Sequence, residues 1–241
     1  MQEEKELKIS VVMPVFNEAD TIGEVVERIR RIPYQKEIII VDDGSTDSSC
    51  EIIKKLSAPF IKKIFHKKNR GKGASIKSAL PVMNHDILII QDADLEYYPE
   101  EYPKLIEPII KGEADVVFGS RFIENGRYSS LIHFVGNKII NLTAAFLYGK
   151  KLSDLLSCYK VFKREIIKSI DLQAEGFGFE AEITGEVLRR KCRLKEVPIS
   201  YVSRSYSEGK KIKRRDFFTI LWWLFRTKLK KRKFNKKATH E

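Results

Sequence analysis

The first half of the chain alternates short apolar runs with amphipathic segments. Residues 9–14, 37–41, 61–66, 86–91 and 115–119 are apolar runs, most of them rich in β-branched side chains, and predict strands. Residues 21–31, 47–56, 73–82 and 99–111 have helical spacing, and Asp20 or Thr21 and Ser45 or Thr46 are placed to cap the first two helices. Several strands are apolar on both faces. The pattern therefore predicts a three-layer, Rossmann-like α/β fold with a mostly parallel central sheet.

The second half is less regular. Residues 129–148 and 179–190 predict helices, residues 194–202 a strand, and residues 217–225 (FFTILWWLF) an apolar segment before the basic residues 226–237. No stretch reaches the roughly 18–20 apolar residues of a membrane-spanning helix, and no apolar run of signal-peptide type follows the N-terminus. We expect a charged tail (1–8), one α/β domain (9–209) and a basic aromatic segment (210–241).

The net charge of +12 is concentrated in one region. Between Arg204 and Lys237 there are 14 Lys/Arg and 2 Asp/Glu, so the remainder of the chain holds 31 residues of each sign and is neutral. This distribution indicates an interaction tail on a balanced domain. The scattered cysteines, Cys50, Cys158 and Cys192, have no metal-ligand spacing and are expected to be reduced thiols in a cytosolic protein.

Polar motifs follow all five predicted strands of the first half. They are Pro14-Val15-Phe16-Asn17-Glu18, Asp42-Asp43-Gly44-Ser45, Asn69-Arg70-Gly71-Lys72-Gly73, Asp92-Ala93-Asp94-Leu95-Glu96 and Gly119-Ser120-Arg121. Ligands of open α/β sheets bind beyond the carboxyl ends of the strands. Five such loops on one sheet edge predict a ligand site there.

Asp92 and Asp94 suggest the chemistry of this site. Two carboxylates just past an apolar strand would repel each other unless a cation lies between them. A Mg²⁺ or Mn²⁺ ion that also binds diphosphate oxygens meets this need. Alone, the pair would fit a solvated turn better than a metal site, and the other four loops turn the balance to the metal.

The acidic loop at residues 42–45 and the basic loop at residues 69–73 each also have a simpler structural interpretation. Gly44 and Ser45 suit a turn and a helix cap, which leaves Asp42 and Asp43 free to bind a base or ribose. Residues 69–73 suit either a flexible basic loop or a phosphate-binding loop, although the Walker spacing is absent.

Together these runs resemble family 2 glycosyltransferases of the GT-A fold, and most of all the polyprenyl-phosphate sugar synthases, the group of the dolichol-phosphate mannose synthases. Residues 153–160 (SDLLSCYK), Gly176-Phe177 with Glu180, and residues 196–199 (EVPI) are similar to further segments of that group. The resemblance covers about residues 8–225. Tyr159 stands where the group usually has glycine.

The resemblance implies a role for each matching residue. For nucleotide-sugar binding these are Pro14, Phe16, Glu18, Val41, Asp43, Lys72, Asp92, Ala93 and Lys210; for the metal, Asp92, Asp94 and Glu96; for catalysis, Asp94, Arg121 and Arg204. Arg121 would face the sugar or the acceptor phosphate, and Lys211 is the alternative to Lys210 in the loop over the phosphates. The expected reaction is inverting transfer of mannose or glucose to a polyprenyl (dolichyl or undecaprenyl) phosphate. GDP-mannose and UDP-glucose both fit, with GDP-mannose preferred.

The acceptor decides whether a base is needed. A lipid phosphate is already ionised, whereas a hydroxyl needs a carboxylate base. Glu180 and Glu182 are the candidates for such a base, and both could equally be ordinary helical acids. Residues 217–225, flanked by cations, suit a helix in the interface of an anionic membrane, which would place the protein peripherally on the cytoplasmic face. A core helix with a basic end and an RNA-binding tail are the alternatives. Residues 131–148 could add a second apolar surface or be a buried helix.

Three other functions compete with this one. They are a family member that glycosylates a glycan hydroxyl, a sugar nucleotidyltransferase, and a basic nucleic-acid-binding protein. A nucleotidyltransferase would have a glycine-rich basic loop where residues 14–18 stand. A nucleic-acid-binding domain would carry cations over its surface, and because this body is neutral no nucleic-acid partner is expected.

Overall fold

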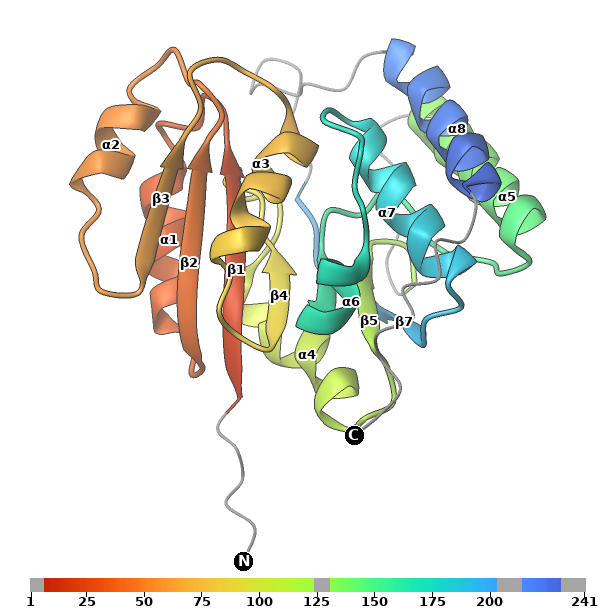
Figure 1. Cartoon of the computed structure of the whole chain (residues 1–241), viewed down its shortest axis with the longest axis horizontal. Helices are drawn as coiled ribbons and strands as arrows, with labels where there is room; N and C mark the ends of the chain where they lie inside the picture. Colours follow the sequence, from red (N-terminus) through yellow and green to blue (C-terminus); the bar gives the residue numbers. More distant parts are fainter. Residues whose placement is uncertain (1–6, 124–130, 203–213, 231–241) are drawn as a thin grey trace, which may run out of the picture.

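The computed structural model describes residues 7–123, 131–202 and 214–230, which are built around one seven-stranded sheet (Figure 1). The strands are β1 (Lys8–Val15), β2 (Gln35–Asp42), β3 (Ile61–Phe65), β4 (Ile87–Ile90), β5 (Val116–Ser120), β6 (Lys160–Lys163) and β7 (Leu194–Pro198). Their order across the sheet is β3-β2-β1-β4-β6-β5-β7. Only β6 runs antiparallel to its neighbours among these strands. The predicted mostly parallel sheet is confirmed.

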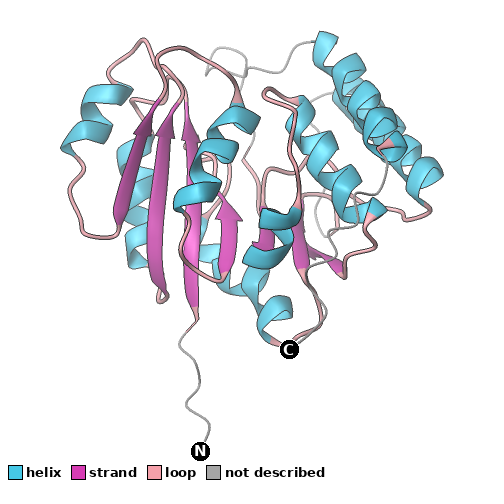
Figure 2. Ribbon diagram, in the orientation of Figure 1, coloured by secondary structure: helices cyan, strands magenta, loops and turns pink. Residues whose placement is uncertain are grey.

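Helices cover both faces of this sheet (Figure 2). They are α1 (Ile22–Arg31), α2 (Ser49–Lys55), α3 (Lys72–Ala79), α4 (Tyr102–Ile110), α5 (Leu131–Tyr148), α6 (Arg164–Ser169), α7 (Gly178–Arg189) and α8 (Arg214–Leu229), with 3₁₀ turns η1 (Leu80–Val82) and η2 (Pro99–Glu101). Alternate strand residues point to opposite faces. Val11 therefore shares a core cluster with Val25 of α1 and Leu105 of α4, whereas Val12 shares one with Ile76 of α3. The result is the three-layer architecture expected from the sequence.

Several elements differ from the predictions. The short elements β6 and α6 were not predicted, and the strand expected over residues 194–202 ends at Pro198. The second helix begins at Ser49 with Ser48 as its N-cap, so the expected capping by Ser45 or Thr46 is wrong. The Ser45 hydroxyl instead accepts a hydrogen bond from the Asn17 amide at 3.0 Å, and the Thr46 hydroxyl one from the Asn17 side chain at 3.2 Å. These hydroxyls join two loops rather than start a helix.

The C-terminal helix α8 packs against α5 and α7 (Figure 1). Its residues Ile220, Trp223 and Leu224 are buried in the core cluster on that side of the sheet. The packing against α7 is close, because a Cβ at Gly178 would overlap the Trp223 indole. The predicted boundary between residues 209 and 210 lies outside the described residues. Within the described part of the chain, no helix is long and apolar enough to cross a membrane.

Candidate active site

The loops after β1, β2 and β4 are tied together at one sheet edge. The Asn17 amide donates to Ser45, and the Glu18 amide donates to the Ser49 hydroxyl at 2.8 Å. The Thr21 hydroxyl donates to the Ala93 carbonyl at 2.6 Å, which joins the first loop to the Asp-Ala-Asp motif. The sequence motifs therefore meet where ligands of open α/β sheets bind.

Asp43 organises the basic loop after β3. Its buried carboxylate accepts hydrogen bonds from the backbone amides of Arg70 (3.0 and 3.1 Å) and Gly71 (2.6 Å), and it lies 2.6 Å from the His66 imidazole. Gly71 has a φ of 97°, in the left-handed region that favours glycine. Asp43 thus fixes the loop that presents Lys72.

Four side chains of alternating charge form a row of ion pairs that begins at the Asp-Ala-Asp motif. In order they are Asp92, Lys72, Glu180 and Lys160. The Lys72 ammonium lies 2.8 Å from Asp92 Oδ1 and 3.0 Å from Glu180 Oε1, and the other Glu180 oxygen lies 2.5 Å from the Lys160 ammonium. The side chains of Lys72 and Asp92 are 16% and 18% exposed, and Lys160 is fully buried. Opposite charges in such a site stabilise one another's ionised form.

These ion pairs shift the pKa values of Asp92 and Lys72. Burial alone would raise the pKa of Asp92, but the charge and hydrogen bond of Lys72 outweigh it and the pKa is lowered. Burial would likewise lower the pKa of Lys72, but the negative charge of Asp92 and Glu180 raises it well above its usual value. Both groups are therefore ionised near neutral pH.

The structure separates the two glutamates that were candidates for a base. They are two residues apart on α7, so they point to different sides of the helix. Glu182 is fully buried: it accepts hydrogen bonds from the amides of Gln173 (2.8 Å) and Ala174 (2.7 Å) and pairs with Lys230 at 2.6 Å. Glu180 alone of the two reaches the strand-end site.

Asp94 and Glu96 lie in the turn that follows Asp92. Asp94 Oδ1 accepts a hydrogen bond from the Glu96 amide at 3.2 Å, and Glu96 Oε2 accepts one from the Tyr201 hydroxyl at 3.2 Å. Leu95 between them has a φ of 60°, which is uncommon for a residue other than glycine. In the part of the chain that is described, no three acidic, His or Cys side chains gather to hold a metal. The structure thus does not bring Asp92, Asp94 and Glu96 together as one ligand set.

A buried polar cluster supports the motif from below. The hydroxyls of Tyr102 and Tyr159 both donate to Gln91 Oε1, at 3.0 and 2.7 Å, and the Gln91 amide donates to the Asp92 carbonyl at 2.9 Å. The Tyr97 ring packs 4.9 Å from that of Tyr159. Tyr159, where glycine was expected, is therefore built into the support of Asp92.

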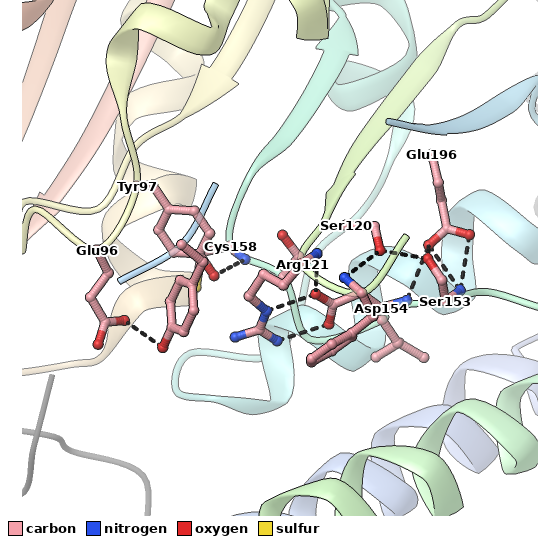
Figure 3. Close-up of polar contacts among 12 residues, drawn as sticks. Glu96, Tyr97, Ser120, Arg121, Ser153, Asp154, Cys158 and Glu196 are labelled. Atoms are coloured by element: carbon pink, nitrogen blue, oxygen red, sulfur yellow. Dashed lines mark hydrogen bonds and ion pairs between the residues drawn. The ribbon is translucent and has the colours of Figure 1, made fainter. Parts of the chain in front are cut away.

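Arg121 is held on the other side of the site by Asp154 (Figure 3). Its Nε and Nη2 donate to the two Asp154 oxygens at 2.7 and 2.8 Å, and its amide donates to Oδ2 at 3.1 Å. Its guanidinium carbon lies 4.9 Å from the centre of the Tyr201 ring. Asp154 is fully buried and the Arg121 side chain is 16% exposed, so the ion pair fixes the guanidinium while the side chain keeps a small exposed area.

The loop that carries Asp154 is fixed in turn by Glu196. The Glu196 carboxylate accepts hydrogen bonds from the amides of Ser153 (2.9 and 3.0 Å) and Asp154 (3.1 Å) and from the Ser153 hydroxyl (2.7 Å). The Ser153 hydroxyl also lies 2.6 Å from that of Ser120, beside Arg121 (Figure 3). The segments around residues 119, 153 and 196 therefore form one support for the arginine.

The remaining predicted residues fall in three groups. Pro14, in the last residues of β1, and Phe16, on the loop after it, are half-buried, and Ala93 is buried in the motif. Val41 is fully buried in the core, so the structure gives it no exposed surface at the site. Arg204, Lys210 and Lys211 lie outside the described residues.

The carboxylates and cations at this sheet edge can bind an anionic ligand together with a cation. A family comparison points to the same kind of ligand. Residues 10–171 match Glycosyl transferase family 2. The match covers more than half of the chain, which belongs to this family.

Three transferases are similar to this chain over most of its length. The dolichol-phosphate mannosyltransferase of Pyrococcus furiosus is 28% identical over 230 residues, which cover 91% of this chain and 63% of the relative. The polyprenol monophosphomannose synthase of Mycolicibacterium smegmatis is 28% identical over 91% of this chain and 88% of the relative. The undecaprenyl-phosphate 4-deoxy-4-formamido-L-arabinose transferase of Salmonella choleraesuis is 31% identical over 84% and 62%. The chain thus spans less than two thirds of the first and third.

Solved structures share the fold. Glucosyl-3-phosphoglycerate synthase from Mycobacterium tuberculosis, crystallised with Mn²⁺, UDP and phosphoglyceric acid, matches with a TM-score of 0.69 at 22% identity, over 90% of this chain and 78% of that one. The predicted GT-A fold is confirmed.

Three supporting residues had no role assigned from the sequence. Asp154 stood in a recognised segment, yet its partner Arg121 is 33 residues away. Gln91 and Lys160 are polar residues at the ends of apolar strands, where their position was the available signal. The partners of all three are set by the tertiary fold.

Proposed function

We propose that this chain is an inverting glycosyltransferase that moves a hexose from a nucleotide-sugar to a polyprenyl phosphate at the cytoplasmic face of a membrane. The observation that carries the proposal is the placement of Asp92, Asp94 and Arg121 after strands β4 and β5 of a family 2 fold, with Lys72 paired to Asp92. Mannosyl and undecaprenyl-phosphate transferases among the relatives support the substrate class. GDP-mannose is the preferred donor, ahead of UDP-glucose.

The donor diphosphate would lie beside Asp92 and Asp94, within reach of Lys72. Mg²⁺ usually binds through one or two carboxylates together with substrate phosphates, and Asp92 and Asp94 fit that mode without a third protein ligand. When bound, the ion would neutralise charge on the leaving diphosphate. Lys72 has three N–H groups, and Asp92 accepts a hydrogen bond from one of them at 3.1 Å, so another can donate to a phosphate oxygen. Arg121 would bind the sugar or the acceptor phosphate, and Arg204 with Lys210 the departing phosphates.

A phosphate acceptor fits the surroundings of the two glutamates. Glu180 is shared by two lysines, and Glu182 by two amides and Lys230. These partners already surround both carboxylates, so neither is placed to take a proton from an acceptor hydroxyl. A lipid phosphate is already ionised and needs no base, so these contacts support it over a hydroxyl acceptor.

Exposed apolar stripes on α5 and α8 support a membrane surface as partner. On each helix, exposed apolar residues recur at positions i, i+4, i+7 and i+11, which lie on one face. They are Val135, Ile139, Leu142 and Phe146 on α5, and Phe218, Trp222, Phe225 and Leu229 on α8. Phe146 and Leu229 are 88% and 80% exposed. Each helix therefore packs one side on the core and presents aromatic and aliphatic groups on another.

Cations accompany the α8 stripe. The Arg226 guanidinium lies 4.8 Å from the Trp222 ring centre and 4.7 Å from that of Trp223, and Lys228, also exposed, lies 5.3 Å from the ring centre of Tyr148 on α5. Aromatic side chains with neighbouring cations suit the headgroup region of an anionic bilayer. This surface would bring the active site to a lipid-linked acceptor.

The test is a matched acceptor experiment. Purified protein is given a panel of nucleotide-sugars with Mn²⁺ or Mg²⁺, and either a short polyprenyl phosphate or the polyprenol of the same length. Release of nucleoside diphosphate should require the phosphate. Release with the polyprenol, and none with the polyprenyl phosphate, would replace this proposal with a hydroxyl-acceptor enzyme.

A further inference from the structure

Glu180 lies between two lysines that differ in their other partners. Lys160, on its inner side, also donates to the Leu155 carbonyl at 3.2 Å and to the Ser157 carbonyl, and its ammonium lies 4.9 Å from the Phe118 ring centre. It is fully buried and held from several directions. Glu180 is thus anchored at its Lys160 end.

Lys72, on the outer side, bridges Glu180 to Asp92. Its ammonium pairs with these two carboxylates, at 3.0 and 2.8 Å. If a cation took over Asp92, a lysine with no second partner would be left as an unpaired charge in a mostly buried site. Such a charge costs several kcal/mol in typical proteins, about 3–5 where a buried pair is broken. Glu180 removes that cost, since it keeps its ion pair with Lys72.

We propose that Glu180 is a positioning residue that shares Lys72 with Asp92, so that Lys72 can yield Asp92 to a divalent cation and remain paired. The inference rests on the proposed function, because it concerns the cation expected at Asp92 and Asp94. It assigns Glu180 a role through Lys72, in place of a base. It also explains why Glu180 lies at the site although both of its oxygens are occupied.

The experiment measures Mn²⁺ binding to the full chain by electron paramagnetic resonance, with no donor or acceptor present. In Glu180→Gln, Lys72 keeps only Asp92, so the affinity for Mn²⁺ should fall about tenfold or more. Adding Lys72→Met removes the competing ammonium, so the double variant should bind Mn²⁺ within about threefold of the parent. A residue with a purely structural role would give no such rescue.

Two further variants separate binding from folding. Glu182→Gln changes the same residue type on the same helix and should leave the Mn²⁺ affinity unchanged. Glu180→Gln leaves the buried Lys160 without its carboxylate partner. Combining Glu180→Gln with Lys160→Met removes that unpaired charge as well. This charge-balanced pair should melt closer to the parent and show the same loss of Mn²⁺ affinity.

The outcomes are distinguishable. If the parent binds Mn²⁺ and the folded Glu180 variants bind it equally well, the inference is overturned and the proposed function stands. Failure of Lys72→Met to rescue, or an equal loss in Glu182→Gln, would also overturn it. If the parent binds no Mn²⁺, the metal part of the proposed function fails and the inference fails with it.

Discussion

Arg121 and Asp154, 33 residues apart in the chain, form a two-point ion pair beside the active-site loops. Two guanidinium nitrogens face two carboxylate oxygens at 2.7 and 2.8 Å, and the carboxylate is fully buried. This fork geometry fixes the plane of an arginine better than a single contact does. Arg121 therefore enters the site already oriented.

Asp154→Asn should both destabilise the protein and slow the reaction. Removing one partner of a buried pair typically costs about 3 kcal/mol or more. We expect a lower melting temperature and at least a tenfold lower kcat, roughly the effect of one misplaced cationic group. Glu165→Gln, at an exposed acid on α6, is the control and should change neither.

The pair Arg121→Met with Asp154→Leu separates the two effects. It removes both charges, so thermal stability should return toward that of the parent. Activity should stay low, because the arginine is gone. Recovery of both stability and kcat would show that Arg121 has no part in the reaction.

Glu37 makes stability depend on pH. Burial would raise its pKa, but the Asn84 amide (2.6 Å), Lys62 (2.6 Å) and the Ser10 hydroxyl (2.5 Å) favour the carboxylate and lower it below the usual 4.5. A lowered folded-state pKa adds stability above pH 4.5, and this stability is lost as the pH falls through the lowered value.

Glu37→Gln should therefore be about 1–3 kcal/mol less stable than the parent at pH 7. The difference should shrink below pH 4.5 as the parent carboxylate becomes protonated. Urea unfolding at several pH values measures it. A stability difference that stays constant between pH 7 and the acid limit of folding would contradict this account.

Tyr159 should matter for packing more than for its hydroxyl. In Tyr159→Phe, Gln91 keeps the hydrogen bond from Tyr102, so we expect a loss of about 1 kcal/mol of stability. Tyr159→Ala leaves a large cavity and should cost about 3–5 kcal/mol. Thermal melting of both variants checks the order. Equal losses would show that the hydroxyl dominates.

The membrane surface is best tested by substitution. A truncation before α8 would remove Ile220, Trp223 and Leu224 from the core, whereas the exposed stripe can be changed without that loss. With Trp222, Phe225 and Leu229 all changed to Ser, sedimentation with anionic liposomes should fall about tenfold or more. Arg226→Gln with Lys228→Gln should weaken binding only to anionic liposomes. Unchanged sedimentation of the serine variant would rule out this surface.

Much of the fold could be predicted because the central strands are continuous apolar runs. Strand β4 (Ile87–Ile90) is one such run and is buried along its whole length, and the acids that follow it could be placed at a sheet edge. Strand β6 has a lysine at each end, and its Lys160 is buried only because Glu180 neutralises it. That partner is 20 residues away, so no local pattern reveals it.

The candidate site was predictable in its loops but not in its contacts. Asp92, Asp94 and Arg121 could be predicted because they follow apolar strands. Their partners could not, because Lys72 and Asp154 come from distant segments that only the tertiary fold brings next to Asp92 and Arg121. Ser45 shows the same limit, because a hydroxyl before a helix predicts a cap and here binds Asn17. The aromatic tail was predicted as an interface helix, and the structure adds that one side of it belongs to the core.

The central claim is that Asp94 serves a metal-assisted glycosyl transfer. The most direct measurement compares nucleoside diphosphate release by the parent, Asp94→Ala and Asp86→Ala, with the best nucleotide-sugar, a short polyprenyl phosphate and Mn²⁺. Asp86 is an exposed acid just before β4, at the strand's opposite end, and is the matched control. We predict a loss of at least about 100-fold for Asp94→Ala and none for Asp86→Ala. An Asp94→Ala protein that turns over as fast as the parent would contradict the account.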